Sequence, residues 1–172
     1  MFSRPDFVTT PYSGNNTDVN VRISLSSDMY NIDGTTNYSG QWLLVNDGQT
    51  YRIAKGSFEN SAVQFRRDEV TNSFLEGKYT INALRENVTE TLAVYVHGTT
   101  HYEIMSAVKS LTDAVSQIRF YMEINLGNVI KGWNCYASDY TVNVTHEFLH
   151  AKLALVTAQI VRDPVETITE EI

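Results

Sequence analysis

The chain has 172 residues, of which 42% are hydrophobic and 19% are charged, and its formal net charge is −7. This size and composition predict one globular domain with a core of its own. The acidic balance argues against binding nucleic acid by neutralising phosphates, and against docking on anionic membranes.

Signals for export and cross-linking are not expected. Cys135 is the single cysteine of the sequence, so an internal disulfide is impossible. The first residues, MFSRPDFVTTPYSG, lack the apolar core of a secretory signal. The apolar runs are all too short to span a membrane, so we expect no membrane anchor.

Alternation of apolar and polar residues predicts β-strands in the first half of the chain. Residues 19–25 alternate in this way and predict a half-buried strand. The runs 41–45 and 50–54 flank an Asp-Gly pair, which predicts a hairpin with Gly48 at positive φ. Further strands are expected at 62–67, 78–84 and 91–97.

A helix is predicted over about 101–118. Thr100 stands three residues before Glu103, which is the spacing of a capping box. Apolar residues then recur at intervals of four and three, so they form one stripe on the helix. The residues of this stripe are Ile104, Val108, Leu111, Val115 and Ile118.

Strand patterns resume after the helix. Residues 120–126 alternate apolar and polar side chains and predict another half-buried strand, followed by two strands at 129–137 and 139–145. These elements belong to a single domain over 1–172 that is mainly β with one packed helix (α+β). An N-terminal extension is expected over about 1–18, and an acidic C-terminal tail over about 163–172.

The stretch 145-THEFLHAKLALV-156 contains His146, Glu147 and His150 in the order H-E-x-x-H. In zinc proteases this pattern supplies two imidazole ligands and a general base. On a helix the two histidines rise about 6 Å along one face, whereas on a strand they stand about 13 Å apart. Leucines and valines after His146 fit helical spacing, but the alternating run 139–145 leads straight into the motif. We therefore expect strand-like backbone at both histidines.

A third zinc ligand is poorly provided. Leu153 and Val156 occupy the places of the glycine and third histidine in the extended metzincin motif. A glutamate ligand would have to come from the C-terminal tail, from Glu166, Glu170 or Glu171. We therefore predict no metal site, and interpret His146 and His150 as ordinary sheet or interface residues.

Other candidate residues have simpler interpretations. His97 and His101 flank a turn, and Cys135 is interpreted as a small packing residue. Four carboxylates are interpreted as solvated charges: Asp68, Glu69, Glu86 and Glu90. We predict no catalytic, cofactor-binding or metal-binding residue and do not expect an enzyme.

The order of these elements resembles that of bacteriophage tail proteins. The segments concerned are 58-FENSAVQFRRDEV-70, 75-LEGKYTINALRENVTETLAVYVHG-98, the helix to Ile118, and 120-FYMEINLGNVIKGWNCYASDYTV-142. They follow the order of the tail-tube fold. In that order, strands come first, then a step from a strand through G-x-[ST] into a helix (here Val96 to Ile104), and then a closing set of antiparallel strands. The resemblance covers about 58–164. More narrowly, the chain resembles small minor tail proteins of siphophages that infect actinobacteria.

This resemblance implies an antiparallel β-sandwich or partial barrel with the helix packed on its side. It also implies a structural protein of the virion tail that assembles in the host bacterial cytoplasm. The implied assembly is a ring of six subunits, or of another multiple of three. Such a ring of the tail tube or distal tail contacts adjacent tail proteins and passes phage DNA without specific binding, which suits an acidic chain. The alternatives are a monomeric β-sandwich binding module and a zinc hydrolase.

The segment 148–161 is expected to form a long strand at a subunit interface. Its run 153-LALV-156 is apolar on both strand faces. Leu155 and Val156 then lie on opposite faces, one toward the core and one toward a neighbouring subunit. The alternative is a strand buried on both faces within one subunit.

Overall fold

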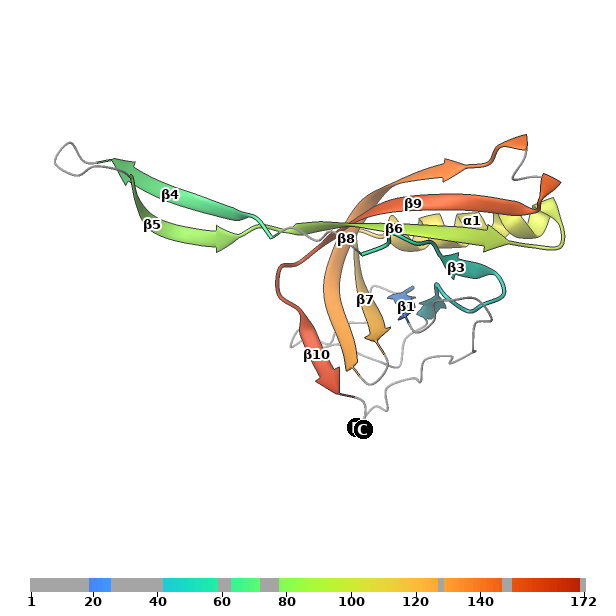
Figure 1. Cartoon of the computed structure of the whole chain (residues 1–172), viewed down its shortest axis with the longest axis horizontal. Helices are drawn as coiled ribbons and strands as arrows, with labels where there is room; N and C mark the ends of the chain where they lie inside the picture. The colour runs from blue at the N-terminus through green and yellow to red at the C-terminus, as the bar shows by residue number, and fades with distance from the viewer. Residues whose placement is uncertain are drawn as a thin grey trace.

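A computed structural model of the chain describes residues 19–25, 42–58, 63–71, 78–126, 129–146 and 150–170. These residues form a mainly β fold with one helix, in which an antiparallel sheet nearly closes into a barrel (Figure 1). The elements are β1 (Val19–Ser24), β2 (Trp42–Leu44), β3 (Tyr51–Ile53), β4 (Phe65–Thr71), β5 (Lys78–Arg85), β6 (Val88–His97), α1 (His101–Val115), β7 (Arg119–Leu126), β8 (Val129–Asn143), β9 (Leu153–Arg162) and β10 (Thr167–Glu170).

The main sheet has the strand order β2-β1-β7-β8-β9-β6-β3, and β10 also pairs with β8. Its longest ladder joins β6 to β9, from Val88 opposite Arg162 to His97 opposite Leu153. The β6 side chains alternate between buried and less buried positions along the whole strand, as a sheet with one face on the core requires. The strands β4 and β5 form a separate two-stranded sheet.

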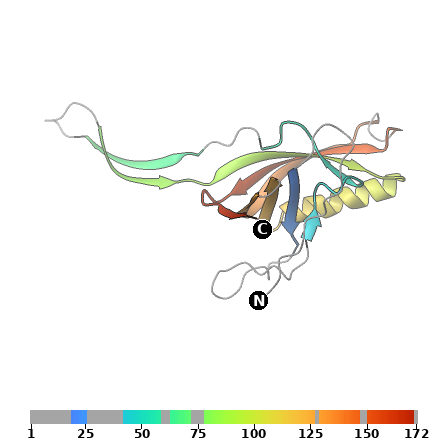
Figure 2. The same cartoon turned by 60° about the horizontal axis from the view of Figure 1, so that its bottom comes forward.

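The helix α1 packs its apolar stripe onto this curved sheet, where it contacts β1, β6, β8 and β9 (Figure 2). The stripe residues from Ile104 to Val115 are buried, which confirms the predicted core face. Ile118 is the exception, because the helix ends at Val115 and leaves this side chain 89% exposed. The end is fixed by Ser116, whose hydroxyl donates a hydrogen bond to the Thr112 carbonyl oxygen at 2.6 Å.

The start of α1 has the predicted N-cap. The backbone N–H of Glu103 donates to the Thr100 hydroxyl oxygen at 3.2 Å, and the Glu103 carboxylate accepts from the Thr99 N–H and hydroxyl. Just before this cap, a Cβ on Gly98 would lie 2.9 Å from the Cγ1 of Ile104. The glycine of the G-x-[ST] step therefore allows β6 to approach the buried first turn of α1.

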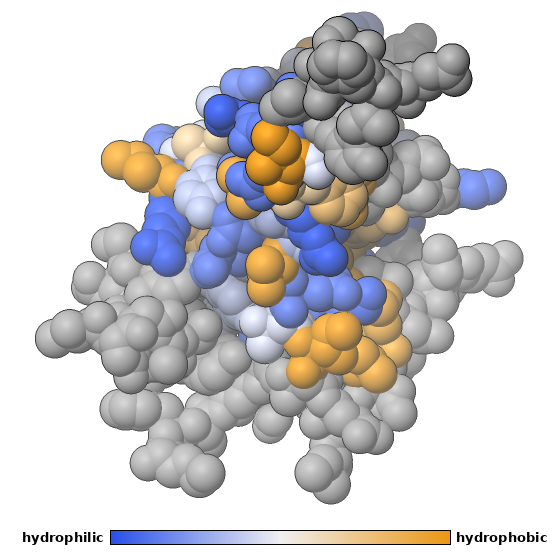
Figure 3. Space-filling model, turned by 90° about the vertical axis from the view of Figure 1, so that its left-hand side faces the viewer, coloured by the Kyte–Doolittle hydropathy of each residue, from blue (hydrophilic) through white to orange (hydrophobic). Residues whose placement is uncertain are grey.

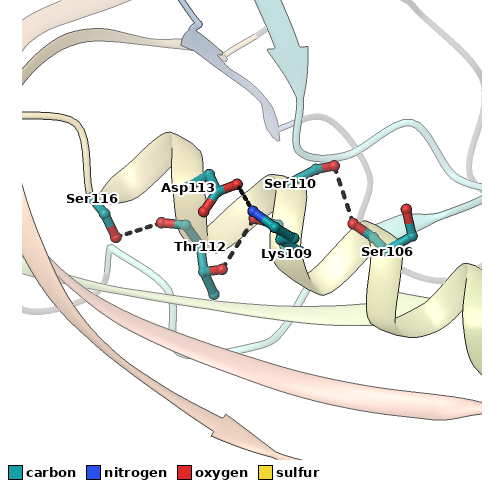
Figure 4. Close-up of polar contacts among 6 residues, drawn as sticks. All are labelled: Ser106, Lys109, Ser110, Thr112, Asp113 and Ser116. Atoms are coloured by element: carbon teal, nitrogen blue, oxygen red, sulfur yellow. Dashed lines mark hydrogen bonds and ion pairs between the residues drawn. The ribbon is translucent and has the colours of Figure 1, made fainter.

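Several polar side chains of α1 form hydrogen bonds and an ion pair within the helix (Figure 4). Lys109 pairs with Asp113 one turn later at 2.5 Å, and both side chains are largely exposed. The Ser110 hydroxyl donates to the Ser106 carbonyl oxygen at 3.1 Å. Exposed pairs of this kind stabilise a helix by only about 0.2–0.5 kcal/mol each. The position of α1 therefore depends on its buried face.

The predicted hairpin between 41–45 and 50–54 is wrong. Both runs contain strands and Gly48 has the expected positive φ of 74°, but β2 pairs with β1 and β3 pairs with β6. The reason lies in Asp47, whose Oδ1 accepts from the N–H groups of Gln49, Thr50 and Tyr51 at 2.8–2.9 Å. This side chain holds an open loop in place of a two-residue turn.

The strands β1 and β7 are buried on both faces, so the predicted half-buried strands are wrong in this respect. Arg22 and Glu123 are 1% and 0% exposed, and their side chains form an ion pair at 2.6 Å. The Arg22 guanidinium lies 4.2 Å from the centre of the Trp42 ring. An alternating pattern shows which residues are polar, but it cannot distinguish a solvated charge from a paired buried one.

The predicted strands 129–137 and 139–145 form one strand, β8. Its register against β9 shifts between Tyr136 and Asp139. At this bulge the Ser138 hydroxyl accepts from the Val161 N–H at 3.1 Å and donates to the Tyr136 carbonyl oxygen at 2.8 Å. A side chain thus bridges the gap in the ladder, and the strand continues past the bulge with a bend.

The acidic segment 163–172 contains β10. This strand pairs with the start of β8, from Thr167 opposite Gly132 to Glu170 opposite Val129.

A Cβ on Gly132 would lie 2.0 Å from the Tyr121 hydroxyl oxygen. A glycine is therefore required where β8 passes Tyr121.

We predict that Leu111→Asp abolishes folding, because Leu111 is 1% exposed in the middle of the stripe. A buried unpaired charge costs several kcal/mol, a large part of the stability of a domain. The control is Ile118→Asp, which should change the free energy of unfolding by no more than about 0.5 kcal/mol at an exposed site. Thermal melting and soluble yield measure both. Equal melting temperatures for the two variants would contradict the assigned core face.

Candidate functional site

The hairpin of β4 and β5 projects from the barrel as an arm (Figures 1 and 2). Its two strands pair from Phe65 opposite Arg85 to Thr71 opposite Lys78, and the register shifts between Asp68 and Glu69. The arm joins the barrel where the Glu86 N–H donates to the Gln64 carbonyl oxygen at 2.9 Å, two residues before β6 begins. Eight residues of strand give the arm a reach of about 26 Å.

Among the described residues, the arm pairs with no strand of the barrel. In the described parts of the chain, β4 and β5 have each other as their sole strand partners. All side chains described between 63 and 69, and between 78 and 86, are exposed. A two-stranded hairpin with no third strand or helix against it is marginally stable in water. Within the described residues, the arm therefore has little to stabilise it beyond its own two-stranded ladder.

Apolar side chains lie on this exposed arm among charged ones. Ile81 is 70% exposed, Leu84 56% and Phe65 41%. Charged groups cover part of the surface, since the Arg67 guanidinium lies 5.8 Å from the Phe65 ring centre and Lys78 pairs with Glu69 at 3.2 Å. Figure 3 shows the molecule from the side on which the arm projects, with hydrophobic residues scattered among hydrophilic ones.

A second candidate surface is the free edge of β8. One edge of β8 pairs with β7 through residues 130–136. From 137 to 143, this edge has no strand beside it within the residues that the structure describes. Tyr140 and Val142 on this stretch are 45% and 38% exposed. Unpaired N–H and C=O groups on such an edge are a template for a strand from another chain.

The H-E-x-x-H motif lies in the connection between β8 and β9. His146 and His150 are exposed and have helical backbone, so the predicted strand at these positions, and a continuous strand over 148–161, are wrong. Glu147, with residues 148 and 149, lies outside the described residues. The chain has to turn here because β9 runs antiparallel to β8, and Lys152 at φ 55° leads it into β9.

Helical backbone removes the distance argument against a shared zinc ion, but a third ligand is still missing from the described residues. No group of three or more His, Cys, Asp or Glu there could hold a metal ion. Glu166 pairs with Lys131 at 3.6 Å near the start of β8, and His146 follows the other end of that strand. The two groups therefore lie at opposite ends of β8.

The burial and partners of the remaining candidate residues indicate structural roles. Cys135 is fully buried, and burial raises the pKa of its thiol, so the reactive thiolate is disfavoured. His97 is half-buried, and desolvation, followed by the nearby Arg52 charge, lowers its pKa. Glu90 was interpreted as solvated, which is wrong, because it is 4% exposed and pairs with Arg162 at 2.7 Å.

Comparison with protein-family models and with curated proteins gives no match. Among solved structures, the chain is similar to a chain in the structure of the phage P2 baseplate in its activated conformation with calcium, with a TM-score of 0.57 and 14% sequence identity. The similarity covers 84% of this chain and 43% of that chain, so this chain spans less than half of its length. The two chains share a fold. In the part of the chain that the structure describes, none of the helical sequence is long and apolar enough to cross a membrane.

We predict that zinc does not copurify with the protein, and that Glu147→Gln changes neither its melting temperature nor its assembly. The reason is that the described residues offer no third ligand near the two histidines. Metal analysis of purified protein checks the first statement. Stoichiometric zinc that is lost in His146→Ala, but kept in the control His101→Ala, would establish a metal centre instead.

Proposed function

We propose that the chain is a non-enzymatic structural component of a bacteriophage tail or baseplate that assembles with further copies of itself into a ring. The observation that carries this proposal is the unsupported arm of β4 and β5, because its strands are stable only when another surface covers them. The fold shared with a chain of a phage baseplate structure supports the choice of a virion tail.

The arm and the free edge of β8 together make head-to-tail assembly possible. The arm extends from the start of β6, whereas residues 137–143 lie at the other end of the barrel (Figure 1). When the arm strand of one copy adds to the β8 edge of the next, two different surfaces meet, and such contacts close into a ring if the rotation permits. A hexamer or another multiple of three is the expected size, from the resemblance to tail-ring proteins.

The outer face of the sheet supplies a broader contact area. On β9, Ala154, Val156 and the following even-numbered residues are buried, whereas Leu153 and Leu155 on the opposite face are half-buried. Leu155 stands opposite Tyr95 of β6, which is also half-buried. Side chains of this size gain free energy when a neighbouring subunit covers them, by about 25 cal/mol for each Å² of apolar surface removed from water.

The charge of the chain fits a ring that DNA traverses. With a net charge of −7, the assembled subunits repel phosphate and do not retain it. Adjacent tail proteins would cover the two ends of the ring, and assembly would take place in the cytoplasm of the bacterial host. Within this proposal the whole chain acts as one tail-tube-like domain, as in siphophage minor tail proteins.

We predict that replacing residues 65–85 with a short glycine-containing turn gives a folded monomer, while the full-length chain forms rings. The arm contributes no described buried side chain to the core, so its removal should leave the melting temperature nearly unchanged. Circular dichroism reports the fold, and sedimentation with electron microscopy reports the ring. A point variant, Ile81→Asp, should weaken assembly in the same direction, whereas Val165→Asp, which is equally exposed off the arm, should not.

Two results would contradict the proposal. Unchanged assembly without the arm would show that the arm is not the contact between copies. A full-length chain that stays monomeric at every concentration would replace the ring with a monomeric β-sandwich binding module.

We predict opposite outcomes for lysine at two neighbouring positions of β9. Val156→Lys should unfold the protein, since Val156 is 1% exposed and faces the core. Leu155→Lys should leave a folded monomer, because the outer face becomes solvated again when the subunits separate. Circular dichroism and sedimentation of each variant measure this. If Leu155→Lys assembles normally, the outer face of β9 lies outside the interface.

A further inference from the structure

The hydrogen-bonding groups on the free edge of β8 follow from the ladders of the sheet. Alternate residues of a strand direct their N–H and C=O groups to opposite edges. Odd-numbered residues of β6, such as Ala93, bond to the side of β3, so the even-numbered ones bond to β9. The β6–β9 and β8–β9 registers then direct the odd-numbered residues of β8 after its bulge toward β9. Tyr140 and Val142 therefore direct their N–H and C=O groups to the free edge.

The same two residues also expose apolar side chains. Tyr140 and Val142 lie on the core side of the sheet, since they stand opposite the buried Ala158 and Val156. They are nevertheless 45% and 38% exposed. Within the described residues, β7 is the strand that covers this edge, and it pairs with β8 only up to Tyr136. A strand added here would therefore gain both a ladder and apolar contacts.

The arm has two outer edges that could supply such a strand. Where the arm meets the barrel, the Glu86 N–H donates to the Gln64 carbonyl oxygen, so even-numbered residues near this end bond across the hairpin. The odd-numbered residues direct their N–H and C=O groups outward, and they are Phe65 and Arg67 on β4 and Ala83 and Arg85 on β5.

The outer edge of β4 matches the free edge of β8 when the two strands run antiparallel with Phe65 opposite Tyr140. Val63, just before β4, is 49% exposed and Phe65 is 41% exposed, so apolar side chains cover each other on the core side. On the other side, an exposed arginine stands opposite an exposed aspartate. Cross-strand pairs of both kinds are stabilising. The facing residues are Val63 with Val142, Phe65 with Tyr140, and Arg66 with Asp139.

Other alignments satisfy fewer of these groups. With Arg85 opposite Tyr140, β5 brings Glu86 opposite Asp139, and like charges that face each other destabilise a ladder. Shifted by two residues, β5 has no charge opposite Asp139. A parallel β4 would separate Arg66 from Asp139. Charge complementarity therefore selects β4 and the antiparallel direction.

The length of the free edge also fits this alignment. The edge ends at residue 137, because β7 begins opposite Tyr136. In the alignment, Asp68 faces residue 137, and the β4–β5 register shifts between Asp68 and Glu69. A bulge bends a hairpin. The arm can therefore turn away from the sheet at the position where β7 takes over.

From these observations we propose that residues 63–68 of one copy add to residues 137–142 of the next copy as an antiparallel strand, with Phe65 opposite Tyr140. The inference rests on the proposed ring and identifies its contact: the arm strand that joins, its direction and its register.

The first test is a cross-link between copies of the full-length chain. In this register Gln64 faces Thr141 as a non-hydrogen-bonded pair, with Cα atoms about 4.5 Å apart, which a disulfide can bridge. Gln64→Cys with Thr141→Cys should therefore give covalent oligomers on a non-reducing gel after mild oxidation. The buried Cys135 takes no part.

Two control pairs test the register and the choice of strand. Gln64→Cys with Asn143→Cys is displaced by two residues, beyond the reach of a disulfide. Leu84→Cys with Thr141→Cys places the thiol on β5 instead of β4. Neither pair should form covalent oligomers.

The second test exchanges charges. Arg66→Asp and Asp139→Arg should each weaken association about two- to thirty-fold for each contact, since a favourable pair becomes a repulsive one. The double variant should restore association. Arg85→Asp, an arm arginine on β5, is the control and should associate as the unaltered chain does. Sedimentation measures association, and circular dichroism confirms that each variant is folded, as expected at exposed positions.

The outcomes separate this contact from the ring itself. If rings form but the Gln64–Thr141 cross-link or the restoration by the double variant fails, the register is overturned and the ring stands. Covalent oligomers from the Leu84–Thr141 pair would also overturn it, because β5 would then be the joining strand. A full-length chain that is monomeric at every concentration overturns the ring and this contact together.

Discussion

The packing of the α1 stripe on the curved sheet is the contact on which the rest of the structure depends. Ile104, Leu111 and Val115 are at most 1% exposed, and they share one core with Val94 of β6 and Val156 of β9. Because one face of the long strands is buried in this way, a slip of one residue would turn their apolar set outward. The register so fixed places the arm at one end of the barrel and the free edge of β8 at the other.

Two buried ion pairs have the same composition but different surroundings. Arg22 pairs with Glu123 against Trp42, and Arg162 pairs with Glu90 against Trp133. The first pair is almost inaccessible to solvent, so its charges are matched within the fold. The second lines a cavity together with Trp133. Breaking either pair would leave a buried charge, at a cost of about 3–5 kcal/mol.

The buried core and the exposed arm lie in different parts of the fold. The barrel and α1 contain the described buried apolar residues, whereas the described side chains of β4 and β5 are exposed. An element with no core of its own can be altered with little effect on folding, but it gains stability only from a partner. Within the proposed function, this division lets a subunit fold alone and assemble through its arm.

The sequence by itself determined the elements with strong local periodicity, including α1 with its Thr100 cap and β6. For the arm it predicted β5 closely, but it placed the first strand at 62–67, whereas β4 spans Phe65–Thr71. Periods of 3.6 and 2 depend on near neighbours, so they can be recognised without the fold. Tertiary structure decided which strands pair, that Arg22 and Glu123 face each other away from solvent, and that the chain turns helically at His146. It also brought residues as distant as Phe58 and Glu166 together in one pocket. These features depend on contacts across the whole chain, and local pattern contains no information about which distant residue will be the partner.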